Sequence, residues 1–336
     1  MIPRCLCLTV CFCLTATALA APRPPATYSI VARDARTGEL GIAVQSHWFS
    51  VGPVVPWAES GVGAVATQSL VDIRYGPMAL ALMKGGRSPE EALRALTASD
   101  AGQALRQVGI IDADGRKATH TGAKCIAVAG HKAGKASDGS AFTAQANMML
   151  RSGVPEAMAR AFEEHAARPL AERLLAALIA AEESGGDIRG RQSAALLVVR
   201  GQSTGRPWED RLVDLRVEDH AEPLAEMTRL LRLHRAYEHM NAGDLAIEKG
   251  DTDAALREYA AARDLAPEQP EMTFWTAVSL VNAGRVEDAF PLFGRTFADR
   301  AEWRELVRRL PASGLMPDDP ALIRRITQTP TTRPAR

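Results

Sequence analysis

The sequence predicts an α+β protein in two parts: β-sheets flanked by helices, and then an all-α part. Short apolar strands bounded by turn residues dominate the chain between Thr27 and Arg216. Two amphipathic helices, expected at residues 155–166 and 170–183, separate the early strands from the last ones. Because a sheet covers one face with another sheet and its outer face with helices, this order favours two packed sheets between helix layers.

A β-hairpin is expected at the start of the first part. Thr27 begins a strand of β-forming residues, the pair Thr37-Gly38 signals a turn, and the apolar run Leu40–Val44 forms the returning strand. The returning strand ends at Gln45-Ser46-His47. The hairpin therefore brings Ser46 and His47 back near Thr27.

The remaining elements of the first part follow from the same kinds of signal. Ser88 precedes a proline and two acidic residues, which is the pattern of a capped helix start. The segment from Asp112 to Gly115 marks the turn of a second hairpin. The strands expected beyond the first hairpin lie at residues 51–55, 63–67, 107–111, 118–122, 193–199 and 211–216.

The first 20 residues have the pattern of a secretory signal peptide. One basic residue, Arg4, precedes an apolar run too short to span a membrane, and Ala18-Leu19-Ala20 supplies small residues for cleavage. Four of the five cysteines leave with this segment, so only Cys125 remains and no disulfide can form within one mature chain. We therefore expect a periplasmic or secreted protein without a membrane span.

The C-terminal third carries an internal repeat that is typical of tetratricopeptide helices. Small and aromatic residues recur about 34 positions apart, in the pairs Gly243/Ala277, Gly250/Gly284, Ala255/Ala289 and Tyr259/Phe293. Such helix pairs usually bind a protein or peptide. The alternative is an appendage that serves packing or dimerisation, and dimerisation would make the protein a homo-oligomer. The chain then divides into residues 1–20 (signal peptide), 21–26 (short Pro-rich extension), 27–221 (sheet domain), 222–310 (tetratricopeptide-like helical domain) and 311–336 (C-terminal tail).

Thr27 stands where an N-terminal nucleophile would lie, at the head of a strand behind an export signal. A Thr hydroxyl is too weakly acidic to attack unaided, and the free α-amine of the same Thr can serve as its base. This chemistry requires Thr27 to be the first residue, whereas signal cleavage leaves residues 21–26 in front of it. A second cut is then needed, and attack by the Thr27 hydroxyl on its own preceding peptide bond would supply it. The alternative is an ordinary β-branched strand residue behind an uncleaved Pro-rich linker.

Further polar residues are candidates for the same site. Ser46 and Gln68 are expected at strand ends, where they could hold the nucleophile and the substrate carbonyl, or else cap nearby backbone groups. Asn147 could donate its amide to a developing oxyanion, a contribution on the order of 3 kcal/mol, or else occupy an ordinary turn. Asp34 and Asp187 are candidates for a carboxylate partner of a basic group near the active site.

Five motifs follow one another along the sheet domain: Thr27-Tyr28-Ser29-Ile30-Val31-Ala32-Arg33-Asp34, Gly61-Val62-Gly63-Ala64-Val65-Ala66-Thr67-Gln68, His120-Thr121-Gly122, Gly190-Arg191-Gln192-Ser193-Ala194-Ala195 and Asp210-Arg211-Leu212-Val213-Asp214-Leu215-Arg216-Val217. Together, from Thr27 to about His220, they resemble the bacterial domain-of-unknown-function family 1028, which is grouped with the Ntn hydrolases. The resemblance implies an αββα sandwich of the Ntn-hydrolase type, whose relatives mostly hydrolyse amide bonds with an N-terminal Thr, Ser or Cys. In many members the Thr directly follows the initiator Met, and this chain differs by its signal and its extension.

The sequence thus predicts an exported amidohydrolase that uses Thr27 on a small amide or peptide bond. The alternative is a non-catalytic envelope binding or assembly protein on the same scaffold. Lys and Arg number 40 and Asp and Glu number 40, so no basic field favours nucleic acid. The histidines lack zinc-protease spacing and the glycine-rich pieces lack a phosphate-loop ending, so we expect neither a metal nor a nucleotide cofactor.

Overall fold

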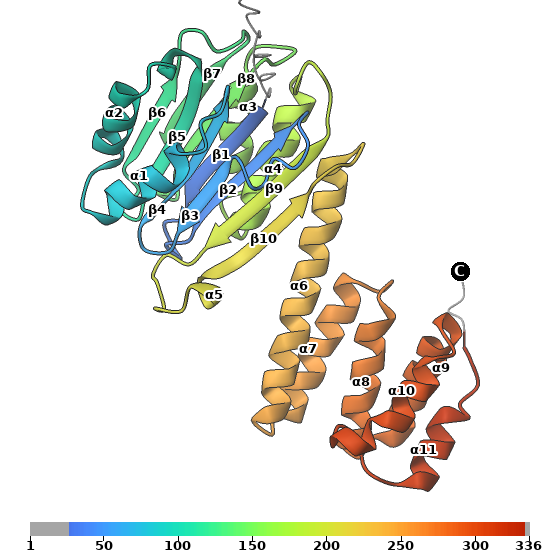
Figure 1. Cartoon of the computed structure of the whole chain (residues 1–336). Helices are drawn as coiled ribbons and strands as arrows, with labels where there is room; N and C mark the ends of the chain where they lie inside the picture. Colours follow the sequence, from blue (N-terminus) through green and yellow to red (C-terminus); the bar gives the residue numbers. More distant parts are fainter. Residues whose placement is uncertain (1–26, 333–336) are drawn as a thin grey trace, which may run out of the picture.

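The computed structural model describes residues 27–332, a mixed α/β region followed by an all-helical region (Figure 1). The predicted signal peptide and the extension 21–26 lie outside these residues. Within residues 27–332, no helix combines the length and the apolar character needed to cross a membrane.

The larger sheet has six antiparallel strands in the order β10-β9-β2-β1-β8-β7. The predicted first hairpin is confirmed, because Thr27 pairs directly with Ser46. On the other side of β1, Thr27 pairs with Asn147. The strands are β1 (Thr27–Arg33), β2 (Leu40–Ser46), β7 (Gly130–Lys135), β8 (Ala141–Asn147), β9 (Ser193–Val199) and β10 (Arg211–Val217), with the short helix α5 (Pro207–Asp210) before the last.

The smaller sheet has four antiparallel strands in the order β3-β4-β5-β6. They are β3 (Pro56–Glu59), β4 (Gly63–Ser69), β5 (Arg106–Asp112) and β6 (Lys117–Thr121). The expected strand at residues 51–55 is wrong. The amides of Val54 and Val55 both donate to the carbonyl of Val51, so this segment turns and the strand begins only at Pro56.

The two sheets face each other, and helices cover their outer faces. Helices α3 (Val154–Glu164) and α4 (Leu170–Glu183) pack on the six-stranded sheet, while α1 (Tyr75–Lys84) and α2 (Pro89–Ser99) pack on the four-stranded one. The predicted cap of α2 is present, since the Ser88 hydroxyl accepts from the Glu91 amide and the Glu91 carboxylate accepts from the Ser88 amide.

Helix α6 (Pro223–Glu248) joins the two regions: it contacts β9, β10 and α4, and it then pairs with α7 (Thr252–Leu265), as Figure 1 shows. A second pair follows, α8 (Pro270–Asn282) with α9 (Val286–Asp299), and then α10 (Trp303–Arg309). The segment from residue 311, separated as a tail in the sequence, contains α11 (Pro320–Thr327). Ile326 of α11 lies in the same buried cluster as Phe274 and Phe293 of the second pair.

Arg173 of α4 is fully buried and ties this helix to two strand turns of the six-stranded sheet. Its Nη1 donates to Asp138 Oδ2 at 2.9 Å and to Ser140 Oγ at 3.1 Å, and Asp34 Oδ2 lies 3.6 Å away. The guanidinium also lies over the Phe162 ring, 4.0 Å from its centroid. This buried cation therefore holds α4 against the turns that follow β1 and precede β8.

Replacing Arg173 with Leu should lower the free energy of unfolding by about 3–5 kcal/mol, because two carboxylates then lose their buried counter-charge. Urea denaturation measures this loss. The matched control is Arg160→Leu on the exposed side of α3, which should change stability by less than about 0.5 kcal/mol. Equal effects of the two substitutions would contradict the role given to Arg173.

Candidate functional site

The layer between the two sheets is apolar at one end and polar at the other. Side chains alternate along each strand, so every second residue points into this layer. At one end the inward residues are Val31, Ile42, Ala66 and Ile111, together with their neighbours in one buried cluster. At the other end they are Thr27, Ser29, Ser46, Gln68, Gln107, Gln145 and Asn147, all of them at most 1% exposed.

Thr27 is at the centre of the polar end. Its Oγ1 lies 3.1 Å from Ser46 Oγ, within hydrogen-bond distance. Its main-chain carbonyl accepts from Gln68 Nε2 at 3.1 Å and from Asn147 Nδ2 at 3.3 Å. The four candidate residues from the sequence are therefore brought together: one holds the Thr27 hydroxyl and two hold its peptide.

Gln107, at the start of β5, connects the two sheets. Its Oε1 accepts from Gln68 Nε2 at 2.7 Å and from Asn147 Nδ2 at 2.9 Å. Its Nε2 donates to the carbonyls of Ala146 and Gly130 at 2.9 and 3.1 Å. One side chain thus fixes both amides that hold Thr27.

Ser29 and Gln145 extend this network one step into the layer. Gln145 Nε2 donates to Ser29 Oγ at 2.8 Å, and Ser29 Oγ donates to Gln68 Oε1 at 2.6 Å. Gly109 on β5 makes room for them: a Cβ there would lie 2.6 Å from Thr143 Oγ1 and would overlap Gln145 Oε1. Gly109 leaves this space to the Gln145 and Thr143 side chains of the opposite sheet, and a larger residue would displace them.

The two strands that carry the amides end in strained backbone. Ser69, directly after Gln68, has a φ of 73°, and Met148, directly after Asn147, has a φ of 58°. Non-glycine residues in this left-handed region cost on the order of 1–3 kcal/mol, and such residues concentrate at functional sites. The chain therefore turns away immediately after each amide that holds the Thr27 carbonyl.

Asp187 lies at this end of the molecule, next to β2. Its Oδ2 accepts from the main-chain amide of His47 at 3.0 Å, and its buried carboxylate pairs with Arg189 at 2.9 Å. Asp34 does not reach this end, because it follows β1 at the opposite side of the sheet and lies beside Arg173. Among residues 27–332, no three His, Cys, Asp or Glu side chains are grouped as metal ligands would be.

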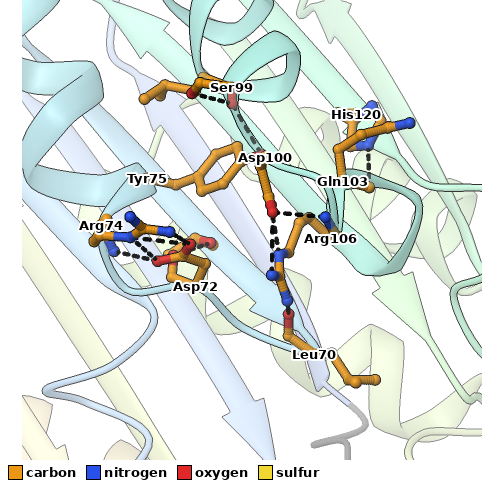
Figure 2. A network of polar contacts seen from close by, with 12 residues as sticks. Leu70, Asp72, Arg74, Tyr75, Ser99, Asp100, Gln103, Arg106 and His120 are labelled. Carbon is orange, nitrogen blue, oxygen red and sulfur yellow. Dashed lines mark hydrogen bonds and ion pairs between the residues drawn. The ribbon is translucent and has the colours of Figure 1, made fainter.

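A second network supports the strands behind the amides (Figure 2). Arg106, adjacent to Gln107, donates from Nε to Asp100 Oδ2 at 2.8 Å and from Nη1 to the Leu70 carbonyl at 2.5 Å. The Tyr75 hydroxyl donates to the same carboxylate at 3.1 Å. Burial and this acceptor raise the pKa of Tyr75, while the Arg106 hydrogen bond holds the pKa of Asp100 below its usual value. The network fixes the loop after β4 to the start of β5.

Comparison with known proteins assigns this part of the chain to a family. The model of DUF1028, described as a family of unknown function, matches residues 27–227. The chain belongs to DUF1028. A similar solved structure is the crystal structure of protein SPO2555 from Silicibacter pomeroyi, described with the same family model. It shares 31% sequence identity at a TM-score of 0.54, over 62% of this chain and 85% of that one. No curated protein matches the chain.

Three members of the polar network between the two sheets were not among the residues selected from the sequence: Ser29, Gln107 and Gln145. Ser29 lies two positions after Thr27, Gln145 lies two positions before Asn147, and Gln107 lies at the start of a strand. Each of the three is a polar residue whose side chain is on the inward face. Alternation along the strands would have selected them once the pairing of the sheets was known.

Gln107→Leu should lower the free energy of unfolding by roughly 2–4 kcal/mol, since the buried amides of Gln68 and Asn147 lose their shared acceptor. Chemical denaturation measures the change. The control is Gln103→Leu in the preceding turn, a partly exposed position, where we expect less than about 0.5 kcal/mol. A Gln107 variant as stable as this control would show that the Gln107 side chain is dispensable for folding.

The Asp100–Arg106 pair should make stability sensitive to acid. Because the folded state lowers the pKa of Asp100, the unfolded state binds its proton more tightly. The stabilisation is complete above the unfolded pKa, near pH 4, and is lost as pH falls through the folded pKa. The free energy of unfolding of the wild type should therefore exceed that of Asp100→Asn by less and less as denaturation is measured from about pH 6 down to about pH 2.5. The difference between wild type and Asp318→Asn, an exposed position, should stay constant.

Proposed function

We propose that this DUF1028 protein is an exported amide or peptide hydrolase of the Ntn type, with Thr27 as its N-terminal nucleophile. The observation that carries the proposal is the convergence of Ser46, Gln68 and Asn147 on Thr27 at the polar end of the sheet layer. Ser46 holds the Thr27 hydroxyl, and two buried amides from two other strands hold the Thr27 carbonyl, which strand formation alone does not require. Buried polar groups are costly unless each is satisfied, so this arrangement serves the Thr27 position.

The proposed reaction begins with processing of the precursor. The Thr27 hydroxyl attacks the carbonyl carbon of residue 26, the C–N bond breaks, and an ester forms while the Thr27 nitrogen becomes a free amine. Water hydrolyses the ester, which releases the preceding segment as a carboxylate and restores the hydroxyl. In the unprocessed chain Thr27 is 0% exposed, so a substrate amide cannot reach its hydroxyl.

The processed Thr27 can then act on a substrate. Its α-amine takes the hydroxyl proton, the oxygen attacks the substrate carbonyl, and the proton passes to the leaving amine. Water then hydrolyses the acyl-enzyme ester. Ser46 Oγ, 3.1 Å from Thr27 Oγ1, orients the attacking oxygen. The Asn147 amide already donates to Thr27 O and to Gln107 Oε1, so donation to an oxyanion requires it to release one of them.

Two features of the fold support this assignment. The order helices, sheet, sheet, helices is the layer order that an αββα sandwich of the Ntn type would have. Both sheets are antiparallel, and β1, which begins with Thr27, lies in the interior of the larger one. The signal-peptide pattern of residues 1–20 supports export, so we place the protein in the periplasm or the medium.

We further propose that the helical region is a tetratricopeptide-like pair of repeats that binds a protein or peptide. The repeat positions have matching environments in α6–α7 and α8–α9. Gly250 and Gly284 both follow a helix with left-handed φ values of 77° and 74°. Tyr259 fills the space that a Cβ at Gly243 would occupy, and Phe293, at the equivalent position of the second pair, is likewise buried.

A protein produced to begin at Thr27, by removal of an initiator Met, should hydrolyse members of a panel of small chromogenic amides and dipeptides. Thr27→Ala keeps the α-amine but removes the nucleophile, so we expect about a 10³-fold or greater loss of kcat/KM. Thr27→Ser should retain measurable activity. The matched control is Thr143→Ala, which removes another buried hydroxyl from the same layer and should leave the rate within about threefold.

Hydrolysis that persists in Thr27→Ala would contradict the assignment of Thr27. If the protein that begins at Thr27 cleaves no member of the panel, the non-catalytic envelope binding or assembly role becomes the better account. A third version, produced to begin at Ala21 with Thr27→Ala to block processing, should be inactive in either case.

A further inference from the structure

Exposed apolar side chains gather on the loops at the Thr27 end of the sheet domain. Six large apolar side chains there are between 38% and 64% exposed: Phe49, Ile73, Ile126, Val128, Leu150 and Ile188. In the part of the sheet domain that the structure describes, only Met78 on α1 and Trp208 on α5 are comparably exposed. We call the six side chains the apolar rim.

The apolar rim is confined to one end of the two sheets. Its members lie on the loops that follow β2, β4, β6 and β8 and on the loop that precedes β9, all at the end where Thr27 lies. The turns at the opposite end, residues 34–39, 113–116 and 136–140, carry no large exposed apolar side chain. Trp208 lies at that opposite end, on α5 before the start of β10 (Figure 1). The same fold thus has an apolar set of loops only around Thr27.

Main-chain hydrogen bonds join the rim loops to the residue that follows Asn147. The amide of Met148 donates to the carbonyl of Ile126 at 3.1 Å, and the carbonyl of Met148 accepts from the amide of Ile188 at 3.2 Å. The amides of the next two residues donate to the same two loops. Asn147 itself donates to the Thr27 carbonyl. The loops that carry four of the six rim side chains are therefore fixed around the strand end that holds Thr27.

A grouping of this kind indicates a binding surface. Single exposed apolar residues are ordinary on protein surfaces, whereas a concentration of them in one place marks a site of interaction. Loops held by a rigid scaffold are also where binding residues are usually found. Since these loops surround the candidate nucleophile, a molecule that reaches Thr27 must pass between apolar side chains.

We propose that the apolar rim binds the acyl group of the substrate, so that the substrates are amides with a large apolar acyl chain. In the proposed reaction the acyl group stays bonded to the Thr27 oxygen until the ester is hydrolysed, whereas the amine leaves after the first step. Contacts with the acyl group therefore contribute to both steps. This inference rests on the proposed function, and it names the substrate class of the same site.

A series of alkanoyl p-nitroanilides tests the proposal on the protein that begins at Thr27. The acyl chain lengthens from acetyl through butyryl and hexanoyl to octanoyl while the leaving amine stays the same. Each methylene that becomes buried contributes roughly a fourfold gain. We expect kcat/KM to rise at least tenfold between the butyryl and the octanoyl substrate.

Variants of the rim test which side chains produce this preference. Leu150→Ser combined with Ile188→Ser should lower the ratio of the octanoyl rate to the butyryl rate at least fivefold, because two apolar contacts with the chain are lost. The matched control is Trp208→Ser, which removes an exposed apolar side chain at the far end and should leave the ratio unchanged. Circular dichroism verifies that each variant is folded.

Binding to a Thr27→Ala protein that begins at the same residue separates this inference from the proposed hydrolysis. That variant cannot turn over an amide, so calorimetry reports binding alone. Octanamide should bind at least tenfold more tightly than butanamide, and Leu150→Ser with Ile188→Ser should reduce the difference. If this preference is found but the active form hydrolyses no amide, the hydrolase proposal fails and the apolar binding site remains.

Several results would overturn the inference. Equal rates along the alkanoyl series, or equal binding of octanamide and butanamide, would show that the rim does not bind an acyl chain. Exposed cations such as Lys124 and Arg151 also lie on these loops, so turnover of glutaryl p-nitroanilide as fast as the hexanoyl substrate would show that charge selects the substrate. A dimer in light scattering that Leu150→Ser dissociates would identify the rim as an interface between two copies of the chain.

Discussion

The structure depends on one constraint: polar side chains buried between two β-sheets must take most of their hydrogen bonds from one another, because they are at most 1% exposed. An unpaired amide in this layer would cost on the order of 1–3 kcal/mol. Gln107 meets the constraint by accepting from two amides and donating to two carbonyls. The relative position of the two sheets at this end is thereby set by hydrogen bonds, whereas apolar packing sets it at the other end.

This division explains why the molecule is supported differently at its two ends. At the apolar end, the buried Arg173 ties α4 to the strand turns and closes the helix side of the larger sheet. At the polar end, Arg106 binds both Asp100 and the carbonyl of Leu70 in the loop between β4 and α1. These contacts hold the end of β4, which carries Gln68. Both ion pairs act on the strands around Thr27, and neither reaches Thr27 itself. The result is a rigid frame around one hydroxyl and one peptide carbonyl.

Much of this frame could be predicted from the sequence, because local signals determined it. The turn at Thr37-Gly38 and the alternation of the flanking strands fix the pairing of Thr27 with Ser46. Gln107 was not selected, because its role depends on contacts with β4 and β8, and no local pattern reports the packing of one sheet on another. The strand β7 was missed because Gly130–Lys135 is largely exposed and lacks β-branched residues. Helix α1 was also missed: its N-cap, Arg74, makes no side-chain hydrogen bond to the helix.

An N-terminal nucleophile depends on the residue at which the mature protein begins. Intact mass and N-terminal sequencing of protein exported by its own signal would determine it. We expect a start at Thr27 in the wild type, and a start at Ala21 in Thr27→Ala, which lacks the hydroxyl needed for the second cut. A wild-type protein that begins at Ala21 and is never trimmed would contradict the N-terminal nucleophile, because the α-amine that serves as the base would not exist.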